Sequence, residues 1–239
     1  MPWRRRASER SLRREGRIWT LWSIGVMLTF GLPAALLVWI EPLAAPAAAI
    51  FLGHGIAVLH VQARRGARGV KRIGEDDARV LRGDSRGGTR LSTPEATALG
   101  LLGDLVGHES RELVMQTGLA LERGRLGAWL VGQEGAILVR RRGHRVHCFC
   151  VRVGEADDLP AADRVAHLLL ALREDEEGFA TVANRNFSGA TWRLRMQLPR
   201  SARRALERAR QLMRASPPGP GSPRPSSRAA PSRRGRGGW

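Results

Sequence analysis

The chain opens with two apolar stretches that are bounded by charged residues. Trp19 to Ile40 runs for 22 residues without a charge, and as a helix it would extend roughly 33 Å, enough to cross a bilayer core. Glu41-Pro42 interrupts the run, and a second apolar stretch follows from Ala47 to Val61. The pattern predicts a two-helix transmembrane hairpin over residues 19–62, with spans at 19–40 and 44–62.

Basic residues flank only the outer ends of this hairpin. Arginines precede the first span and follow the second, whereas the connection between the spans contains none. Because cytoplasmic flanks carry the excess of Lys and Arg, we expect a multi-pass protein of the cell (inner) membrane with both termini in the cytoplasm. The residues expected at the membrane interface are Trp19, Trp22, Trp39, Arg13, Arg14, Arg17, Arg64 and Arg65.

A cleaved signal peptide is the competing interpretation of the first apolar run. Ala44-Ala45-Pro46-Ala47 offers small residues for cleavage, and Arg13-Arg14 is a twin-arginine pair. The apolar core of a signal peptide is usually about 7–15 residues. The longer run in this chain favours the hairpin.

The second span contains His54 between Gly53 and Gly55. An ionisable group at this depth is either functional or hydrogen bonded to a neighbouring helix at a close contact, and we favour the second interpretation. The Ala47-Ala48-Ala49 run likewise indicates tight helix packing. The hairpin could therefore mediate homo-oligomerisation.

The remaining chain predicts a basic arm at 1–18, a basic juxtamembrane linker at 63–91, and a small soluble domain at 92–215. Ser92-Thr93-Pro94-Glu95 begins a helix, and a second short helix ends at Gly118. Short branched runs between glycine turns then predict an antiparallel β-meander. Its strands are expected at Leu119–Glu122, Leu126–Val131, Ala136–Arg140 and Val146–Val153. With its flanking helices, the domain is of the α+β class.

The second half of the domain alternates helix and strand. Pro160 begins a helix with Val165, Leu168, Leu169 and Leu172 on its buried face, and strands are expected at Phe179–Ala183 and Thr191–Leu198. The alternation in the last strand predicts a half-buried sheet. A basic amphipathic helix over Ser201–Met213 covers either that sheet or the membrane surface, and we favour the sheet.

Net charge is distributed unevenly along the chain. Residues 1–73 carry 12 basic and 3 acidic side chains, and residues 199–239 carry 11 basic and 1 acidic, whereas residues 74–198 sum to −1. The expected partner of the basic flanks is a bilayer with anionic headgroups. The tail at 216–239 is rich in Pro, Ser, Gly and Arg and is expected to be disordered. In the alternative that the chain binds nucleic acid or another acidic partner, this tail alone is the expected site, with Arg224, Arg228, Arg233, Arg234 and Arg236.

One cluster has the residue types of a metal or thiol site, namely His144, His147, Cys148 and Cys150. On an extended strand both thiols point to one face and His147 to the other, so the cluster does not converge on an ion. Buried core cysteines are favoured over a metal site or a reactive thiol. We predict no cofactor and no metal, and the sequence identifies no catalytic residue.

The order helix, three strands, helix, strand resembles nucleases of the restriction-endonuclease type. The metal site of that family needs an acid on the second core strand and an acid-x-Lys on the third. The corresponding strands, at 136–140 and 146–153, contain neither the carboxylates nor the lysine. The resemblance is one of shape, and the acidic runs Glu155–Asp158 and Glu174–Glu177 are interpreted as solvated charge.

The sequence therefore predicts a membrane protein that presents a non-catalytic interaction or regulatory domain in the cytoplasm, with an unknown protein partner. Binding of nucleic acid or an acidic partner by the tail is one alternative. A membrane-anchored enzyme with a degenerate nuclease-like fold is another, and it requires a shared pocket around His144, His147 and Cys148.

Overall fold

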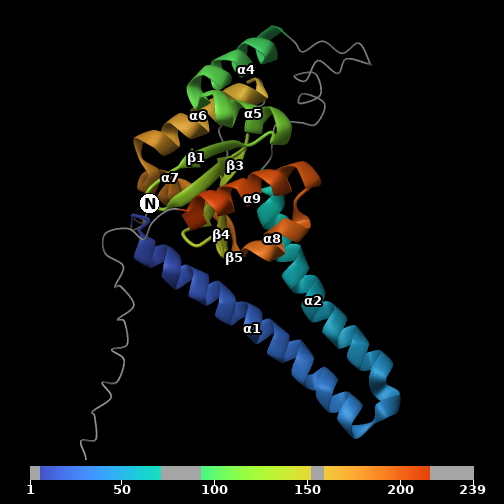
Figure 1. The fold of residues 1–239 in the computed structure, drawn as a ribbon. Helices are drawn as coiled ribbons and strands as arrows, with labels where there is room; N and C mark the ends of the chain where they lie inside the picture. The colour runs from blue at the N-terminus through green and yellow to red at the C-terminus, as the bar shows by residue number, and fades with distance from the viewer. Residues whose placement is uncertain (1–5, 71–92, 152–158, 216–239) are drawn as a thin grey trace, which may run out of the picture.

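The computed structural model describes residues 6–70, 93–151 and 159–215. Two long apolar helices lead into a five-stranded antiparallel sheet with flanking helices (Figure 1). Helix α1 (Glu9–Ile40) and helix α2 (Ala45–Arg68) are joined by the 3-10 turn η1 (Pro42–Ala44). The two helices project from the sheet-containing part of the molecule as a hairpin.

Both hairpin helices extend beyond the predicted spans. Ser8 caps α1, since its hydroxyl accepts a hydrogen bond from the Ser11 amide at 3.2 Å and its own amide donates to the Ser11 hydroxyl at 2.9 Å. Helix α2 runs six residues past the predicted end at 62, into the predicted linker. It does so because Ala63 and Gly66 are buried and pack with the rest of the fold.

The sheet is formed by a meander and one later strand. Strands β1 (Ala120–Arg123), β2 (Gly127–Val131), β3 (Gly135–Arg140) and β4 (Arg145–Cys150) pair in sequence order, and β5 (Asn184–Ala190) pairs with β4. Every pair is antiparallel. The turn between β3 and β4 places Arg142 and Gly143 in the left-handed region, with φ of 74° and 68°; glycine adopts this region without steric cost.

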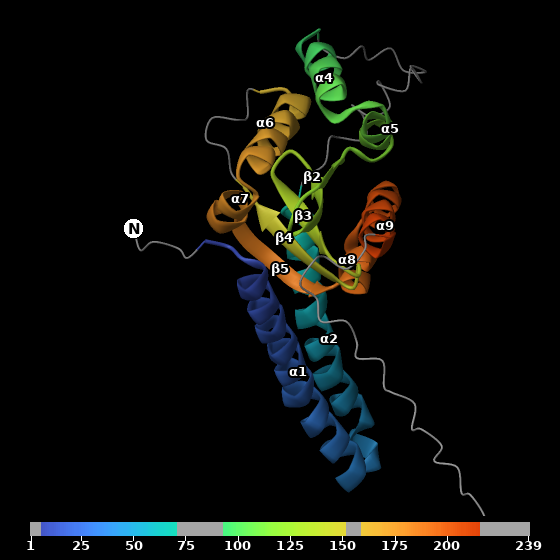
Figure 2. The same cartoon turned by 60° about the vertical axis from the view of Figure 1, so that its left-hand side comes forward.

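Helices cover both faces of the sheet (Figure 2). One face is packed by α4 (Thr93–Val106), α6 (Ala161–Glu174), α7 (Glu176–Val182) and the first turns of α1. The other is packed by the end of α2, α8 (Thr191–Gln197) and α9 (Arg200–Ala215). Helix α5 (His108–Thr117) lies against β1 at one edge.

Each face has its own apolar core. On the α6 side, the Trp129 ring lies 5.3 Å from that of Phe149 and 5.6 Å from that of Phe179, between ring centroids. On the α9 side, Ile137 and Phe187 are fully buried. Burial of each such side chain stabilises the fold by about 1.5–3 kcal/mol.

Several sequence predictions of local structure are confirmed. The four meander strands occur where they were expected, and the short helix ends at Gly118, which adopts the left-handed conformation. The predicted buried stripe of α6 is fully buried. Helix α9 packs on the sheet, with Ala205, Leu206 and Ala209 facing β2 and β3.

Three predictions about the second half of the domain are wrong. Thr191–Leu198 is the helix α8 and its end, not a strand, and residues 179–182 belong to α7. The fifth strand instead lies between them, at Asn184–Ala190. The sheet is also not half-buried, because the hairpin helices and α9 add a second covering layer. Residues 1–5, most of the predicted linker, the run Glu155–Asp158 and the tail at 216–239 lie outside the described residues.

Candidate functional site

The four predicted site residues do not meet in one pocket. His147 and Cys148 are adjacent on β4 and point to opposite faces of the sheet, so Cys148 packs in the core with Phe187 and α2 while His147 faces the α1 side. Cys150 is half-buried at the end of β4, and His144 is exposed in the β3–β4 turn. The shared pocket that the enzyme hypothesis requires is not formed.

Burial keeps both core groups in their neutral forms. Desolvation raises the pKa of the Cys148 thiol far above its usual value. Desolvation, followed by the charges of Arg140 and Arg145, lowers the pKa of His147 to about 3. At neutral pH these groups are a thiol and an uncharged imidazole. Within residues 6–70, 93–151 and 159–215, no three His, Cys, Asp or Glu side chains are grouped as metal ligands.

His147 belongs to a polar cluster between α1 and the sheet. It lies directly opposite Ser188 of β5, and both ring nitrogens and the Ser188 hydroxyl are buried without a hydrogen-bond partner among the described residues. Arg140, at the end of β3, donates a 3.1 Å hydrogen bond to Glu9 of α1. No sequence pattern indicated this cluster, because the strand that carries Ser188 is polar and contains glycine.

The hairpin encloses the edge strand β5 from both faces. On one face Glu15 of α1 forms an ion pair with Arg185. On the other, Gly66 of α2 lies so close to Phe187 that any side chain at position 66 would collide with that ring. Trp19 of α1 packs edge-on against the same ring at 6.0 Å between centroids. The first half of α1 and the last turns of α2 are therefore part of the folded domain.

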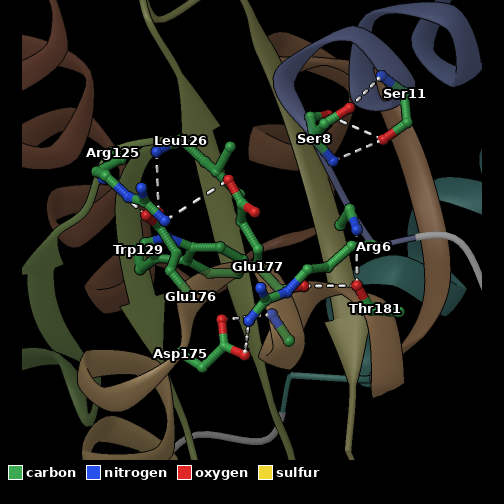
Figure 3. A network of polar contacts seen from close by, with 12 residues as sticks. Arg6, Ser8, Ser11, Arg125, Leu126, Trp129, Asp175, Glu176, Glu177 and Thr181 are labelled. Atoms are coloured by element: carbon green, nitrogen blue, oxygen red, sulfur yellow. Dashed lines mark hydrogen bonds and ion pairs between the residues drawn. The ribbon is translucent and has the colours of Figure 1, made fainter.

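The segment before α1 is held by α7 (Figure 3). Arg6 pairs with Asp175 at 2.5 Å, and the Ala7 amide donates to the Thr181 hydroxyl at 2.7 Å. The Gly178 amide, and then Arg6, hold the pKa of Asp175 below its usual value. These contacts hold the segment that leads into α1 against α7.

Glu176, in the acidic run interpreted as solvated, is buried. Its carboxylate accepts hydrogen bonds from the amides of Arg125 and Leu126 at 2.7 and 3.0 Å, and from the Trp129 indole at 2.6 Å (Figure 3). Three donors satisfy a carboxylate that would otherwise be costly to bury. This residue holds the β1–β2 turn on α7 and is structural.

Helix α8 is hydrogen bonded to the domain end of the hairpin, near the start of the first uncharged run and the end of the second. Arg193 donates to the Ser23 hydroxyl at 3.1 Å and to the Leu59 carbonyl at 2.8 Å. The Gln197 amide group and a ring nitrogen of His60 lie 3.0 Å apart. Closer to the hairpin tip, a ring nitrogen of His54 lies 2.8 Å from the Ile50 carbonyl oxygen of its own helix. The expected hydrogen bond from His54 to a neighbouring helix is therefore not formed within the described residues.

The predicted interface residues lie at the two ends of the hairpin, with Trp39 near the tip and the others near the domain. Trp22 and Trp39 are 43% and 82% exposed, whereas Trp19 is partly covered by Phe187. Arg13 pairs with Glu9 at 2.7 Å. The other predicted basic residues are exposed, namely Arg14, Arg17, Arg64 and Arg65.

A groove of about 1000 Å³ lies at the opposite edge of the sheet, between α5, β1 and α9. Leu113, Leu121 and Leu212 form its apolar floor, and Glu112, Gln116, Arg123 and Arg204 are among its polar lining residues. Apolar and charged side chains are thus mixed along its lining.

Comparisons of the chain with protein-family models, with curated proteins and with solved structures find no match.

Proposed function

We propose that this chain is an integral membrane protein whose α1–α2 hairpin crosses the bilayer twice and holds the α+β domain against the cytoplasmic surface, where the domain acts as an interaction or regulatory module. The observation that carries the proposal is the exposure of the hairpin. In the most apolar 18-residue window of α1 only 6% is buried, and in that of α2 only 11%.

This exposure supports a membrane span over the core helix of a soluble protein. A core helix is apolar because it is covered, whereas Leu21, Leu28, Leu32 and Ile40 of α1 are each at least 60% exposed. A contiguous apolar surface of this size is unfavourable in water. Lipid tails are the covering that these side chains require.

The same helix argues against a cleaved leader. Leu12 is fully buried in the core and Glu9 bonds Arg140 of the sheet. Removal of the segment before Ala47 would take these contacts out of the domain and expose its face. A signal peptide is dispensable to the mature fold, and the beginning of α1 is not.

The distribution of arginine supports the orientation. The exposed arginines of α1 and α2 lie at the domain end, and the loop Glu41–Ala44 at the hairpin tip contains no basic residue. Under the positive-inside rule the domain end is cytoplasmic. Both termini then lie on the same side as the domain.

The groove between α5, β1 and α9 supports a binding role for the domain. It lies at the sheet edge opposite the one enclosed by the hairpin, since β1 and β5 are the two outer strands. Its apolar floor and charged rim match the composition of protein interfaces. A partner could reach it while the hairpin stays in the bilayer.

Cysteine accessibility in intact cells tests the topology. Single cysteines are introduced into a chain that carries Cys148→Ala and Cys150→Ala. One is Leu43→Cys at the hairpin tip and the other is Leu101→Cys on α4. The native leucines at these positions are 87% and 60% exposed. An impermeant maleimide applied from outside should label position 43 only. Labelling of position 101 from outside would overturn the orientation, and a protein recovered in the soluble fraction would overturn the membrane assignment.

Site-specific photocrosslinking tests the binding role. A photoreactive side chain at Gln116, in the groove, should give a discrete protein adduct in native membranes, and the same probe at Leu101, outside it, should not. Equal adducts at both positions, or none at Gln116, would argue against the groove as the partner site.

A further inference from the structure

Helix α8 presents an apolar stripe to the outside of the molecule. Trp192 and Met196 are 62% and 58% exposed, and a spacing of four residues puts them on one helix face. Leu194 and Leu198 occupy the opposite face and are buried. One apolar face of the helix therefore packs in the core, and the described residues leave the second apolar face uncovered.

The position of this stripe is fixed by bonds to the hairpin. Arg193 reaches Ser23 of α1 and Leu59 of α2, and Gln197 contacts His60. Ser23 follows the start of the first uncharged run, and His60 precedes the end of the second. Figure 1 shows α8 at the end of the domain from which the hairpin emerges. The stripe therefore lies at the level where a spanning hairpin would enter the headgroup region.

Positive charge accompanies the stripe. The β3–β4 turn is tied to the start of α8, since the Thr191 amide donates to the His144 carbonyl at 3.0 Å and its hydroxyl to the Gly143 carbonyl at 2.9 Å. Arg141 and Arg142 of that turn and Arg195 of α8 are exposed. Apolar side chains next to arginines are the composition of segments that bind anionic bilayer surfaces.

We infer that α8 and the β3–β4 turn form an interfacial membrane contact, in which Trp192 and Met196 enter the boundary between headgroups and acyl chains while Arg142 and Arg195 bind the phosphates of anionic lipids. The inference rests on the proposed function, because only a hairpin that spans the bilayer brings α8 to its surface. We assign the bilayer as the partner of this stripe, because α8 is bonded to the hairpin and the stripe adjoins the apolar hairpin surface that lipid would cover.

Quenching by lipids with brominated acyl chains tests this contact in the full chain. A fluorophore is placed at Met196→Cys, at Leu28→Cys in the hairpin, or at Leu101→Cys on α4, each in the background without native cysteines and each in lipid nanodiscs. The three native side chains are similarly exposed, at 58%, 60% and 60%. We expect quenching at positions 196 and 28 and none at position 101.

The three positions separate the two ways of failing. An unquenched probe at position 28 would refute the membrane assignment itself. If the probe at position 28 is quenched and the probe at position 196 behaves like the one at 101, only the α8 contact is refuted and the membrane assignment stands.

Lipid composition tests the charged part of the contact. Each arginine near an anionic surface contributes on the order of 1 kcal/mol, about a fivefold change in association. Quenching at position 196 should rise when phosphatidylglycerol is added to phosphatidylcholine discs. The double variant Arg142→Gln, Arg195→Gln should lose this rise, whereas the control Arg123→Gln on β1 should keep it. A rise that persists in the double variant would contradict phosphate binding by these arginines.

Discussion

Arg193 of α8 donates a 2.8 Å hydrogen bond to the Leu59 carbonyl of α2, a helix that precedes it by more than a hundred residues. The same guanidinium reaches Ser23 of α1 and lies 5.4 Å from the centre of the Phe187 ring of β5. One side chain thus contacts both hairpin helices and the strand between them. We expect the hairpin and the domain to move as one unit.

Replacement of Arg193 should loosen this connection. A hydrogen bond from a charged donor contributes about 1.5–3 kcal/mol, so Arg193→Ala should lower the thermal unfolding midpoint in nanodiscs by several degrees. Arg195→Ala, on the exposed face of the same helix, should change it little in discs of phosphatidylcholine, which lack anionic lipid. Equal effects of the two substitutions would show that the bond to Leu59 is not important for stability.

A matched pair of glycines in α2 tests the packing around β5. Gly→Ala within a helix normally stabilises by about 1 kcal/mol, and Gly53→Ala has open space around it. Gly66→Ala should instead destabilise by about 1–3 kcal/mol, because its methyl group would collide with Phe187. Thermal unfolding of both variants decides the point. A stabilising Gly66→Ala would mean that α2 does not pack on the strand.

Glu176 should be more important for stability than its acidic neighbours. Glu176→Ala leaves the buried indole of Trp129 and two amides without their acceptor, and should cost about 3 kcal/mol or more. Glu176→Gln retains one acceptor oxygen and should cost less. The exposed Glu174 provides the control, as Glu174→Ala should be almost silent in the same unfolding measurement.

His147 should make stability depend on pH below neutrality. Its pKa is about 3 in the folded chain and 6.5 in the unfolded chain, so between these values only the unfolded chain binds a proton. Stability is then complete above pH 6.5 and falls as the pH drops towards 3, by up to about 1.4 kcal/mol per pH unit. His147→Leu should flatten the pH profile and leave stability at pH 7 almost unchanged.

The exposed His144 serves as the control for this titration. His144→Leu should keep the slope of the parent protein between pH 6.5 and 4, because the His144 side chain is exposed in the β3–β4 turn and lies outside the buried cluster around His147. A parent-like slope in His147→Leu would show that carboxylates alone produce the acid dependence.

The local parts of the fold were predictable because their signals are local. Gly118 ends α5, Pro160 precedes α6, and the glycine turns delimit the meander. Helix α8 was missed because Trp192, Leu194, Met196 and Leu198 alternate like a strand. They also form two pairs spaced by four residues, one buried and one exposed, and seven residues are too few to separate the two periods.

The contacts between distant segments could not be predicted. Strand β5 contains Asn184, Arg185 and Asn186, and it becomes part of the sheet because α1 and α2 cover it from both faces. The opposite directions of His147 and Cys148 followed from the strand period alone. The burial of His147 beneath α1 and the bonds of Glu176 depend on tertiary packing, which no spacing in the sequence reveals.

Power saturation of a spin label at Leu28→Cys, in the full chain reconstituted into liposomes, tests the membrane assignment most directly. Leu101→Cys on α4 is the matched control, since both leucines are 60% exposed. A spanning hairpin predicts that the label at position 28 is accessible to oxygen and shielded from a water-soluble nickel complex, with the opposite result at position 101. Nickel accessibility at both positions would contradict the account.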